Sequence, residues 1–306
     1  MITACICFRN EGEEVRNTIK SIRGTTQDMP ILLVDDYSND GYDYLQTAVD
    51  YGCKYHRMTE RVGSVGTKDW AGRNVDTEYF VLLDGHMRFY IQDWDKLLEE
   101  ALIKNPNSII SSRTIYLSKE NGEVVNKDNY TIRSMCARVE FGNGFEFDPK
   151  WTDAEINEKD GLCDVPCVLG ACYAISKAWW ECIDGFNGLE IYGLEETYMS
   201  LKTWLCGGSC KVTKNFGAGH IYRSINPNSI PSLTIDYNRL VCGYVFDTDF
   251  AELCMNLSKR IGYNNFIGAL KMFEENFDNL KAIKKEFQAH RARPLCWFKD
   301  ELNSKA

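Results

Sequence analysis

The run Phe80 to Phe89, FVLLDGHMRF, constrains the fold of this chain more than any other stretch. Its apolar residues stop abruptly at Asp84 and His86, which is typical of a buried parallel strand that ends at the carboxyl edge of a sheet. Open α/β sheets bind ligands at that edge. An Asp-x-His pair can offer one carboxylate oxygen and one imidazole to a divalent cation such as manganese. The structural alternative is that Asp84 caps the next turn and His86 packs.

The residues before this run alternate between strand-like and helix-like patterns. Strands are predicted at Ile2 to Phe8, Pro30 to Val34 and Cys53 to Met58. Helical spacing follows each of them, and the third helix begins in the glycine-spaced loop RVGSVGTKDWAGRN. The order β-α-β-α-β-α-β predicts an α/β fold with a doubly wound, mostly parallel sheet.

Such a half-sheet usually holds a nucleotide, and two acids end its second strand. Asp35 and Asp36 are placed to accept from ribose hydroxyls or a base N–H, unless they only cap the following turn. The GSVG spacing is not a dinucleotide fingerprint, because the order Gly-x-Gly-x-x-Gly is absent and the segment follows the third strand. We therefore predict no NAD site. Arg61 and Lys68 either face a phosphate-bearing ligand or are solvated surface charges.

Beyond the opening run the pattern becomes less regular. We expect a helix over Asp93 to Lys104, a strand over Ser108 to Arg113 and a hairpin around Asn121-Gly122. Residues Gly142 to Cys163 are polar, aromatic-rich and poor in periodicity. Long irregular segments in compact domains are often functional, so we expect this one to flank the site.

The next segments supply further candidate site residues. A strand is predicted over Val165 to Ile175, interrupted at Gly170-Ala171, where small residues let a ligand approach the backbone. Glu195 and Glu196 begin a helix that Gly207-Gly208 ends, and acids at a helix start are either functional or favoured by the helix dipole. The run GHIYR then adds His220 and Arg223, so that a third metal ligand is available.

Composition excludes several classes of protein. The net charge of −9 weakens a case for broad phosphate binding, although a local basic patch remains possible. The 13 cysteines are spread through apolar runs, which favours reduced core residues, and CDVPC lacks the second pair of a zinc site. No apolar stretch approaches the ~20 residues of a membrane span, and the first strand leaves no room for a signal peptide. We expect a cytoplasmic protein.

Seven motifs occur in one order over about residues 3 to 224: FRNE, VDDYSND, RVG, LLDGH, EIYGLEE, WLCGGS and GHIYR. Together they resemble the GT-A glycosyltransferases, and among these the catalytic domain of the polypeptide N-acetylgalactosaminyltransferases is most similar (family 2/27-like). Several motifs in one order are far more specific than one. The resemblance implies a metal-dependent transferase that takes its sugar from a nucleotide-sugar donor, a UDP-sugar.

The resemblance also implies roles for particular residues. Asp84, His86 and His220 would hold Mn²⁺ or another divalent cation against the donor diphosphate. Arg223 falls on a mobile arginine after the histidine, and it joins Glu195 and Glu196 as the catalytic set. The residues implied in donor binding are Phe8, Asn10, Glu11, Asp35, Asp36, Arg61, Gly63, Lys68, Gly85, Gly170, Ala171 and Tyr192.

Three departures from the family pattern affect the donor sugar and the stereochemistry. Gly85 replaces a serine, Tyr192 a tryptophan and Glu196 an asparagine. Inverting relatives have an acid at the position of Glu196, where it serves as the base. The surrounding motifs match the retaining relatives, so we expect retention, with Glu195 positioning the donor sugar and Glu196 secondary.

Residues 225–306 match no motif of the family and are expected to form three or four helices, around Ile235, Phe250, Phe266 and Leu280. The predicted division is therefore a catalytic domain over 1–224 and a helical region over 225–306. The acceptor cannot be inherited from the family and is expected to be intracellular: a hydroxylated base in DNA, a polypeptide or a glycan.

A basic segment from Lys281 to Lys299, with interleaved aromatic residues, is either a polyanion-binding surface or a solvated amphipathic helix. Two rival functions remain open, a nucleotidyltransferase or sugar-nucleotide synthase and a nonenzymatic nucleotide-sugar-binding module. The oligomeric state is open as well.

Overall fold

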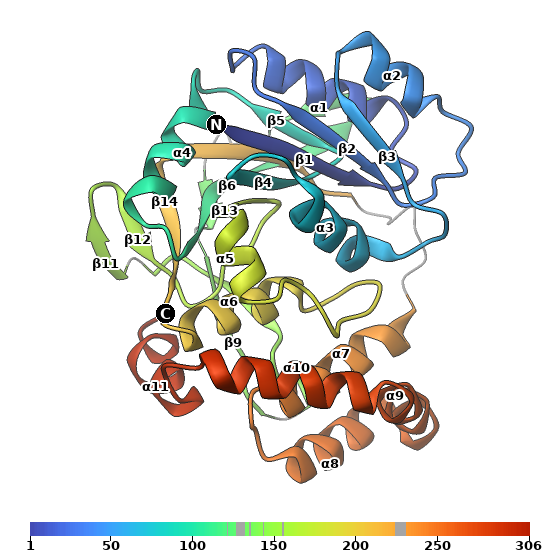
Figure 1. Ribbon diagram of the computed structural model, residues 1–306, viewed down its shortest axis with the longest axis vertical. Coiled ribbons are helices and arrows are strands. Elements are labelled where there is room, and N and C mark those ends of the chain that lie inside the picture. Colours follow the sequence, from blue (N-terminus) through green and yellow to red (C-terminus); the bar gives the residue numbers. More distant parts are fainter. Residues whose placement is uncertain (121, 127–131, 135, 143, 155, 224–230) are drawn as a thin grey trace.

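A single large mixed sheet forms the centre of the protein. The structure is a computed structural model, and it describes residues 1–120, 122–126, 132–134, 136–142, 144–154, 156–223 and 231–306. Among these residues the strand order is β11-β12-β14-β6-β13-β4-β1-β2-β3, and helices cover both faces (Figure 1). The predicted α/β architecture is confirmed.

The N-terminal half is the predicted doubly wound unit. Its four strands pair in parallel in the order β4-β1-β2-β3. The strands are β1 (Ile2–Phe8), β2 (Ile31–Asp35), β3 (Lys54–Arg57) and β4 (Tyr79–Asp84), and the helices between them are α1 (Glu13–Arg23), α2 (Tyr44–Asp50) and α3 (Gly63–Asn74).

Alternation along β1 builds a hydrophobic core on each face of the sheet. Ala4 and Ile6 pack with α1 and α2, whereas Cys5 and Cys7 pack with α3 and the helices beyond it. This strand is buried over its whole length, and the first charged residue after it is Arg9. The sheet thereby presents its polar groups at one edge.

The second half adds strands of both directions. β5 (Met87–Phe89), α4 (Trp94–Lys104) and β6 (Ser108–Glu120) follow β4, and later come β13 (Cys172–Ser176) and β14 (Ser209–Ile221). β13 lies antiparallel between β4 and β6, while β14 runs parallel to β6 and antiparallel to β5. In the last pairing His220 faces Met87, which brings the end of β14 beside the turn after β4.

Two expectations in the middle of the chain were wrong. The strand predicted from Val165 begins only at Cys172, because Val165 and Cys167 pair singly with other segments and Gly170 has a φ of +120°. The segment Gly142 to Cys163 is less irregular than expected. It contains β10 (Pro149–Thr152), β11 (Ile156–Lys159) and β12 (Leu162–Asp164), three strands too short to show a period.

The expected hairpin is present as β6 paired with β7 (Glu123–Val125), where Glu120 faces Glu123, although Asn121 lies outside the described residues. β8 (Ile132–Ser134) pairs with β6, and β9 (Cys136–Val139) forms a separate two-stranded ribbon with β10. This ribbon lies beside the C-terminal end of the chain, because Asn303 hydrogen-bonds to the backbone of Val139.

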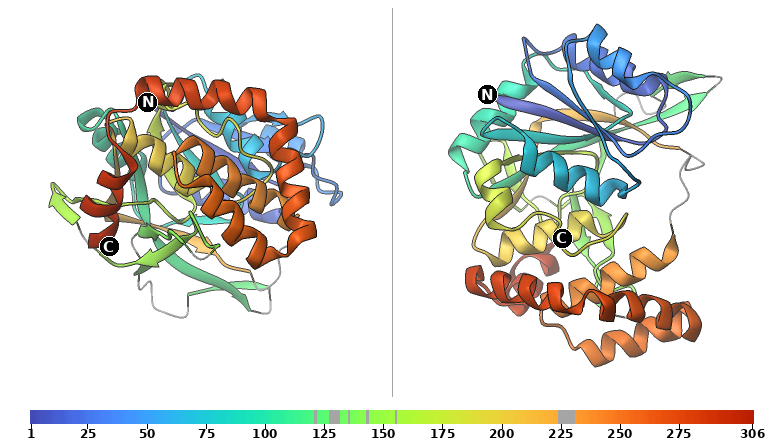
Figure 2. Two further views of the ribbon diagram at one scale, coloured as in Figure 1. Left: turned by 90° about the horizontal axis from the view of Figure 1, so that it is seen from below. Right: turned by 45° about the vertical axis from the view of Figure 1, so that its right-hand side comes forward.

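The C-terminal region is helical, as predicted. After α5 (Lys177–Cys182) and α6 (Glu195–Leu205) come α7 (Ser232–Val245), α8 (Phe250–Ile261), α9 (Tyr263–Glu275), α10 (Phe277–His290), α11 (Leu295–Glu301) and the short η1 (Asn303–Lys305). The right-hand view of Figure 2 shows these last helices gathered at the end of the molecule away from β1 and β2.

α11 was not expected. Leu240, Phe246 and Phe287 share one hydrophobic cluster with α6 and with the sheet, and the domain boundary at residue 224 stays a prediction.

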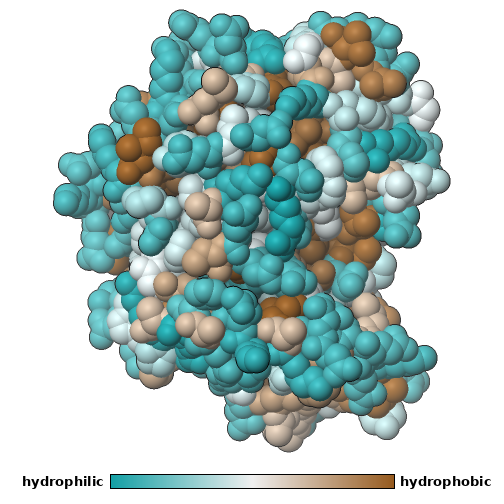
Figure 3. Space-filling model, viewed as in Figure 1, coloured by the Kyte–Doolittle hydropathy of each residue, from teal (hydrophilic) through white to brown (hydrophobic). Residues whose placement is uncertain are grey.

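Among the described helices, none has both the length and the apolar character needed to cross a membrane. The face in Figure 3 is mainly hydrophilic, with small separate hydrophobic patches.

Candidate active site

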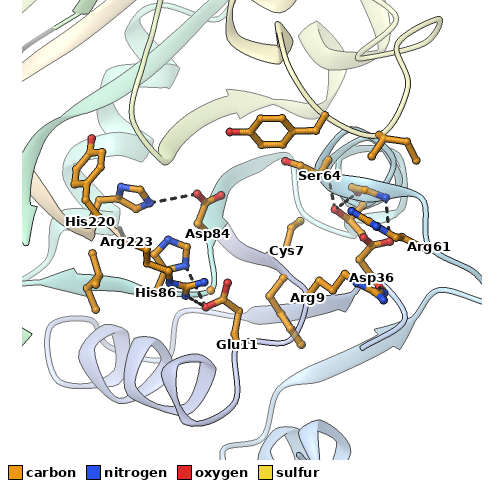
Figure 4. Close-up of a pocket in the computed structure, with 18 residues that line it drawn as sticks. Cys7, Arg9, Glu11, Asp36, Arg61, Ser64, Asp84, His86, His220 and Arg223 are labelled. Carbon is orange, nitrogen blue, oxygen red and sulfur yellow. Dashed lines mark hydrogen bonds and ion pairs between the residues drawn. The ribbon is translucent and has the colours of Figure 1, made fainter. Parts of the chain in front are cut away.

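A cavity of about 370 Å³ opens at the carboxyl ends of β1 and β4. The loop after β1, the start of α3, the loop before α6 and the end of β14 form its walls (Figure 4). It is lined by Cys7, Phe8, Arg9, Glu11, Asp36, Arg61, Gly63, Ser64, Thr67, Asp84, Gly85, His86, Ile191, Tyr192, His220, Ile221, Tyr222 and Arg223.

Three potential metal ligands meet at one end of this cavity. One donor atom each from Asp84, His86 and His220 lies within 4.8 Å of the others. His220 Nε2 is 3.4 Å from Asp84 Oδ2, and the two imidazole centroids are 4.7 Å apart. The pairing of β14 with β5 explains how residues so distant in sequence come together.

The protonation states of these side chains suit a divalent cation. Burial alone would raise the pKa of Asp84. Lys68 and His220 lower it by more than burial raises it, so the net pKa lies far below its usual range. Burial lowers the pKa of His220, which leaves its imidazole neutral and able to ligate. In the described part of the chain Nδ1 of His220 has no hydrogen-bond partner, and Nε2 has only its 3.4 Å contact with Asp84. A neutral imidazole beside a carboxylate fits Mn²⁺ or a similar metal.

Lys68 contacts Asp84, one of the potential metal ligands. Its Nζ is 3.2 Å from Asp84 Oδ1, and the side chain is almost completely buried. Burial lowers the pKa of Lys68, but the opposing fields of Asp84, Glu196 and Glu195 raise it above its usual value. The lysine is therefore a fixed cation between Asp84 and the two glutamates.

Glu11 joins two segments that carry other candidate residues. Its Oε2 lies 3.3 Å from His86 Nδ1 and also forms an ion pair with Arg223, as the dashed line and the labelled side chains of Figure 4 show. Burial raises the pKa of Glu11, and His86 and Arg223 lower it to a net value below normal. Because this carboxylate contacts Nδ1 of His86, the other ring nitrogen, Nε2, is the one that would bind a metal.

Gly85 adjoins Glu11, and the packing there explains one departure from the family pattern. A Cβ on Gly85 would lie 2.9 Å from both Glu11 Cγ and Phe8 Cβ. Any larger residue requires one of these side chains to shift. The present position of Glu11 therefore depends on the glycine at position 85.

The opposite end of the cavity is built around Asp36. Its Oδ1 accepts from Val62 N at 2.6 Å and from Gly63 N at 3.0 Å. Burial raises the pKa of Asp36, and these two hydrogen bonds oppose the shift. Gly63 has a φ of +74°, and a Cβ there would lie 2.1 Å from Ile191 O, so only glycine fits between Asp36 and the loop before α6.

Asp35 and Asn10 do not line the cavity. Asp35 is completely buried, and its carboxylate accepts from Ser38 N at 2.8 Å, Tyr55 Oη at 2.8 Å and Arg57 Nη1 at 3.2 Å. Asn10 donates from its side chain to Asn39 Oδ1 at 3.0 Å and from its backbone to Ser38 Oγ at 2.9 Å. Both residues brace the loop that carries Asp36.

Neither of the two glutamates lines the cavity. Glu195 Oε2 accepts from Gly193 N at 2.7 Å. Burial is the main cause that raises the pKa of Glu195 to about 7, and repulsion from Glu196 is the second. Glu196 Oε1 accepts from Tyr173 Oη at 2.7 Å.

Gly170 and Ala171, the small residues expected at the sugar pocket, lie near Tyr173, the hydrogen-bond partner of Glu196. The Tyr173 hydroxyl also contacts the carbonyl oxygen of Gly170, and Ala171 is buried in the core beside it. No described residue of Gly142 to Cys163 lines the cavity, and the expectation that this segment flanks the site stays a prediction.

Sequence reasoning missed several residues that line the cavity. Arg9 lies within the motif FRNE and Tyr222 within GHIYR, but neither was singled out, and Thr67 directly precedes Lys68. Tyr222 lies two positions after His220 and one position after the end of β14. The Tyr222 ring packs edge-on against His220 with centroids 4.6 Å apart. Ile191 belongs to the motif EIYGLEE but was not singled out, because its role depends on a φ of +50° and a contact with Gly63.

Sequence comparisons find relatives among the polypeptide N-acetylgalactosaminyltransferases. Polypeptide N-acetylgalactosaminyltransferase 16 of Mus musculus is 24% identical over 241 residues, covering 74% of this chain and 41% of that protein. Polypeptide N-acetylgalactosaminyltransferase 6 of Bos taurus is 25% identical, covering 97% of this chain and 49% of that protein. The chain thus spans about half the length of these curated relatives or less.

Solved structures support the fold assignment. The crystal structure of GalNAc-T7 with UDP, GalNAc and Mn²⁺ superposes with a TM-score of 0.77 at 19% identity, over 99% of this chain and 57% of that one. S. aureus TarS, residues 1–349 in complex with UDP-GlcNAc, gives a TM-score of 0.59 at 13% identity, over 94% and 87%. The architecture is therefore the GT-A fold.

The family assignment comes from the sequence itself. The model of the family described as "Glycosyl transferase family 2" matches residues 3–155, which include β2 to β4 and two of the potential metal ligands, Asp84 and His86. That match spans half of the 306 residues. The chain belongs to glycosyl transferase family 2.

Proposed function

We propose that this protein transfers a sugar from a UDP-sugar to an acceptor hydroxyl, with a divalent cation held by Asp84, His86 and His220. The observation that carries the proposal is the cavity itself, which has a three-residue ligand set at one end and Asp36 with Arg61 at the other. A nucleoside diphosphate has a matching shape, with a hydrogen-bonding base at one end and a metal-binding diphosphate at the other. Structural neighbours were solved with UDP and Mn²⁺, which supports the same donor chemistry.

The nucleoside end depends on a braced acid. Asp36 is fixed by the backbone of Val62 and Gly63, and Asp35 fixes the loop on the other side through Ser38. An acceptor of hydrogen bonds held in this way can take N–H or O–H donors of a base or ribose without reorganisation. Arg61 lines the same end of the cavity, where its positive charge favours an anionic nucleotide.

The diphosphate end depends on charge neutralisation. A bound Mn²⁺ would neutralise the charge that develops on the leaving UDP. Arg223 lines the same end of the cavity, where its guanidinium can donate to a phosphate oxygen once it exchanges Glu11 for the ligand. Lys68 keeps Asp84 ionised and oriented through its contact with Oδ1.

The sugar end lies toward Gly170, Ala171 and the two glutamates. We assign Glu195 to positioning the donor sugar and give Glu196 a secondary role. Retention of the anomeric configuration is the outcome that this arrangement supports best, because Glu196 already accepts a hydrogen bond from Tyr173 and faces the Lys68 cation. A carboxylate held in this way is not poised to take a proton from an acceptor in the cavity.

A panel of UDP-sugars tests the proposed function. Purified protein is incubated with each sugar in Mn²⁺ without an acceptor, and release of UDP is measured alongside the same reaction in chelator. The proposal predicts slow hydrolysis of one donor that requires Mn²⁺ and is lost in Asp84→Asn. A nucleotidyltransferase would release or consume pyrophosphate instead, and a binding module would show a thermal shift without hydrolysis. Either result would contradict the proposal.

A further inference from the structure

The basic segment near the C-terminus is mostly neutralised by its own neighbours. Lys284 Nζ lies 2.6 Å from Asp247 Oδ1, and Arg291 Nη1 lies 2.8 Å from Asp247 Oδ2. Arg293 donates to the carbonyl oxygens of Trp204 and Gly208 at 3.0 and 3.1 Å. These contacts tie α10 and the segment after it to Asp247 and to the end of α6, and a polyanion-binding surface here stays a prediction. Lys299 is different, because it lines a second cavity.

This second cavity has a volume of about 710 Å³ and lies between the β9–β10 ribbon and the C-terminal end of the chain. It shares no residue with the active-site cavity. Its lining residues are Arg138, Val139, Glu140, Phe141, Gly142, Phe145, Lys150, Lys299, Asn303 and Ser304.

The two walls of the second cavity are tied together. Asn303 Oδ1 accepts from Val139 N at 2.7 Å, and Asn303 Nδ2 donates to Val139 O at 2.8 Å. Because one side chain satisfies both backbone groups of a strand residue, η1 is fixed against β9. The cavity is thus a defined feature of the fold (Figure 2, left, where the C-terminus lies beside the ribbon).

Positive charge is concentrated in this cavity although the protein is acidic overall. Arg138 and Lys150 are direct cross-strand partners in the ribbon, and both side chains are exposed. Like charges placed opposite each other destabilise a strand pair. Glu140 is the only acid among the lining residues, and its Oε2 lies 3.6 Å from Lys150 Nζ. Within the described residues Arg138 and Lys299 have no acidic partner.

Aromatic rings accompany these cations. The Phe145 side chain is 44% exposed, and Lys150 Nζ lies 5.9 Å from the centroid of its ring. Lys299 Nζ lies 4.3 Å from the centroid of Phe141. A ligand that covers Phe145 would bury apolar surface while its anionic group met the three cations.

We propose that this second cavity binds a phosphate ester whose ring or apolar portion lies on Phe145. Phosphate is favoured because its several oxygens can accept from Arg138, Lys150 and Lys299 together, and these donors come from three different elements. Such a ligand would relieve the repulsion between Arg138 and Lys150. The phosphate can belong to a free monoester or to a diester within a larger molecule.

Phenyl phosphate and diphenyl phosphate are suitable probes for the two forms. Each is titrated into isotopically labelled protein, and backbone amide shifts in β9, β10 and α11 report binding at the second cavity. Shifts in α3 and in the β4–β5 turn separately report any binding in the active-site cavity. Tighter binding of the monoester would identify a terminal phosphate, and tighter binding of the diester would identify a phosphate within a chain. Phenol serves as the neutral control.

Three variants decide whether the cavity is responsible. The double variant Arg138→Ala with Lys299→Ala should weaken binding of the preferred probe about tenfold or more. Glu140→Gln should tighten it several-fold, because the one competing carboxylate is removed, and a merely damaged fold cannot produce tighter binding. Lys271→Ala, which removes an exposed lysine paired with Glu275 on α9, should change nothing. Equal binding by wild type and the double variant, or no tightening in Glu140→Gln, would overturn the proposal.

Discussion

Glu11 and Arg223 form an ion pair at the edge of the active-site cavity, although 212 positions separate them in the sequence. The same carboxylate oxygen lies 3.3 Å from His86 Nδ1. One side chain thus connects the loop after β1, the turn after β4 and the end of β14. Carboxylates in this position fix the tautomer and the orientation of a metal-binding histidine.

Glu11→Gln should therefore weaken Mn²⁺ binding with little effect on the fold. The amide keeps the size of the side chain but loses the charge that orients His86 and holds Arg223. Loss of such a supporting contact lowers metal affinity by about 10- to 100-fold. Calorimetric titration with Mn²⁺ measures the change. Glu13→Gln is the matched control, because Glu13 is half exposed and pairs with Arg16. Equal Mn²⁺ affinities in wild type and Glu11→Gln would disprove the role of Glu11.

Gly63→Ala tests the contact between α3 and the loop before α6. The new Cβ would lie 2.1 Å from Ile191 O, and the residue would also keep its φ of +74°. We expect a loss of about 2 kcal/mol or more in the free energy of unfolding, together with weaker UDP binding, because the Gly63 N–H also holds Asp36.

Gly52→Ala separates the steric clash from the backbone strain. Gly52 directly follows the C-cap residue of α2 with a φ of +61°, and the space at its Cβ position is open. Its alanine variant should lose only the ~1 kcal/mol of a left-handed backbone. Urea unfolding of both variants compares the two. Equal losses would show that the contact with Ile191 is not important.

Much of the site was predictable because it follows from one rule about parallel sheets. Polar residues directly after buried strands led to Asp36, Asp84 and His86, and the ordered motifs added His220 and Arg223. The structural role of Asp35 was not predictable from its own segment. Its carboxylate accepts hydrogen bonds from Tyr55 and Arg57, which are two positions apart on β3, and these contacts depend on the register of β2 with β3.

Other features depend on contacts that no local pattern contains. The hydrogen bond between Tyr173 and Glu196 requires β13 to start at Cys172 and to lie beneath α6. The role of Glu11 requires three segments to meet. The second cavity requires η1 to fold back on β9, although its three cations are visible in the sequence.

Glu195 should make stability depend on pH. Burial and Glu196 raise the pKa of Glu195 from an ordinary 4.5 to about 7, so the folded state binds this proton more tightly than the unfolded state does. The resulting stabilisation is fully present below pH 4.5 and is lost as the pH rises through 7. Relative to Glu195→Gln, metal-free wild type should lose on the order of 3 kcal/mol across this window.

Urea unfolding at pH 4.5 and pH 8 measures that difference. Glu286→Gln, which alters an exposed carboxyl on α10, should follow the wild type at both pH values. A constant difference in unfolding free energy between wild type and Glu195→Gln at the two pH values would show that Glu195 keeps an ordinary pKa.

The product of the transfer should retain the anomeric configuration of the donor. Glu196 is engaged by Tyr173 and faces Lys68, so Glu196→Gln should keep more than about a tenth of the wild-type rate. NMR of the product anomer, taken with the donor identified in the panel, settles the stereochemistry. Tyr173→Phe removes the same hydrogen bond from the other side and should have a similarly small effect. An inverted product with a rate loss of about 100-fold or more in Glu196→Gln would make Glu196 the catalytic base.

The binding of UDP with and without Mn²⁺ tests the metal site most directly. Calorimetry is performed on wild type, Asp84→Asn and His220→Ala, with His290→Ala as the control because His290 is an exposed residue of α10. In wild type and His290→Ala, UDP should bind on the order of 100-fold more tightly in Mn²⁺ than in chelator, and this difference should disappear in Asp84→Asn and His220→Ala. Equal UDP affinity of the wild type in Mn²⁺ and in chelator, or an undiminished effect of Mn²⁺ in His220→Ala, would contradict a metal site at Asp84, His86 and His220.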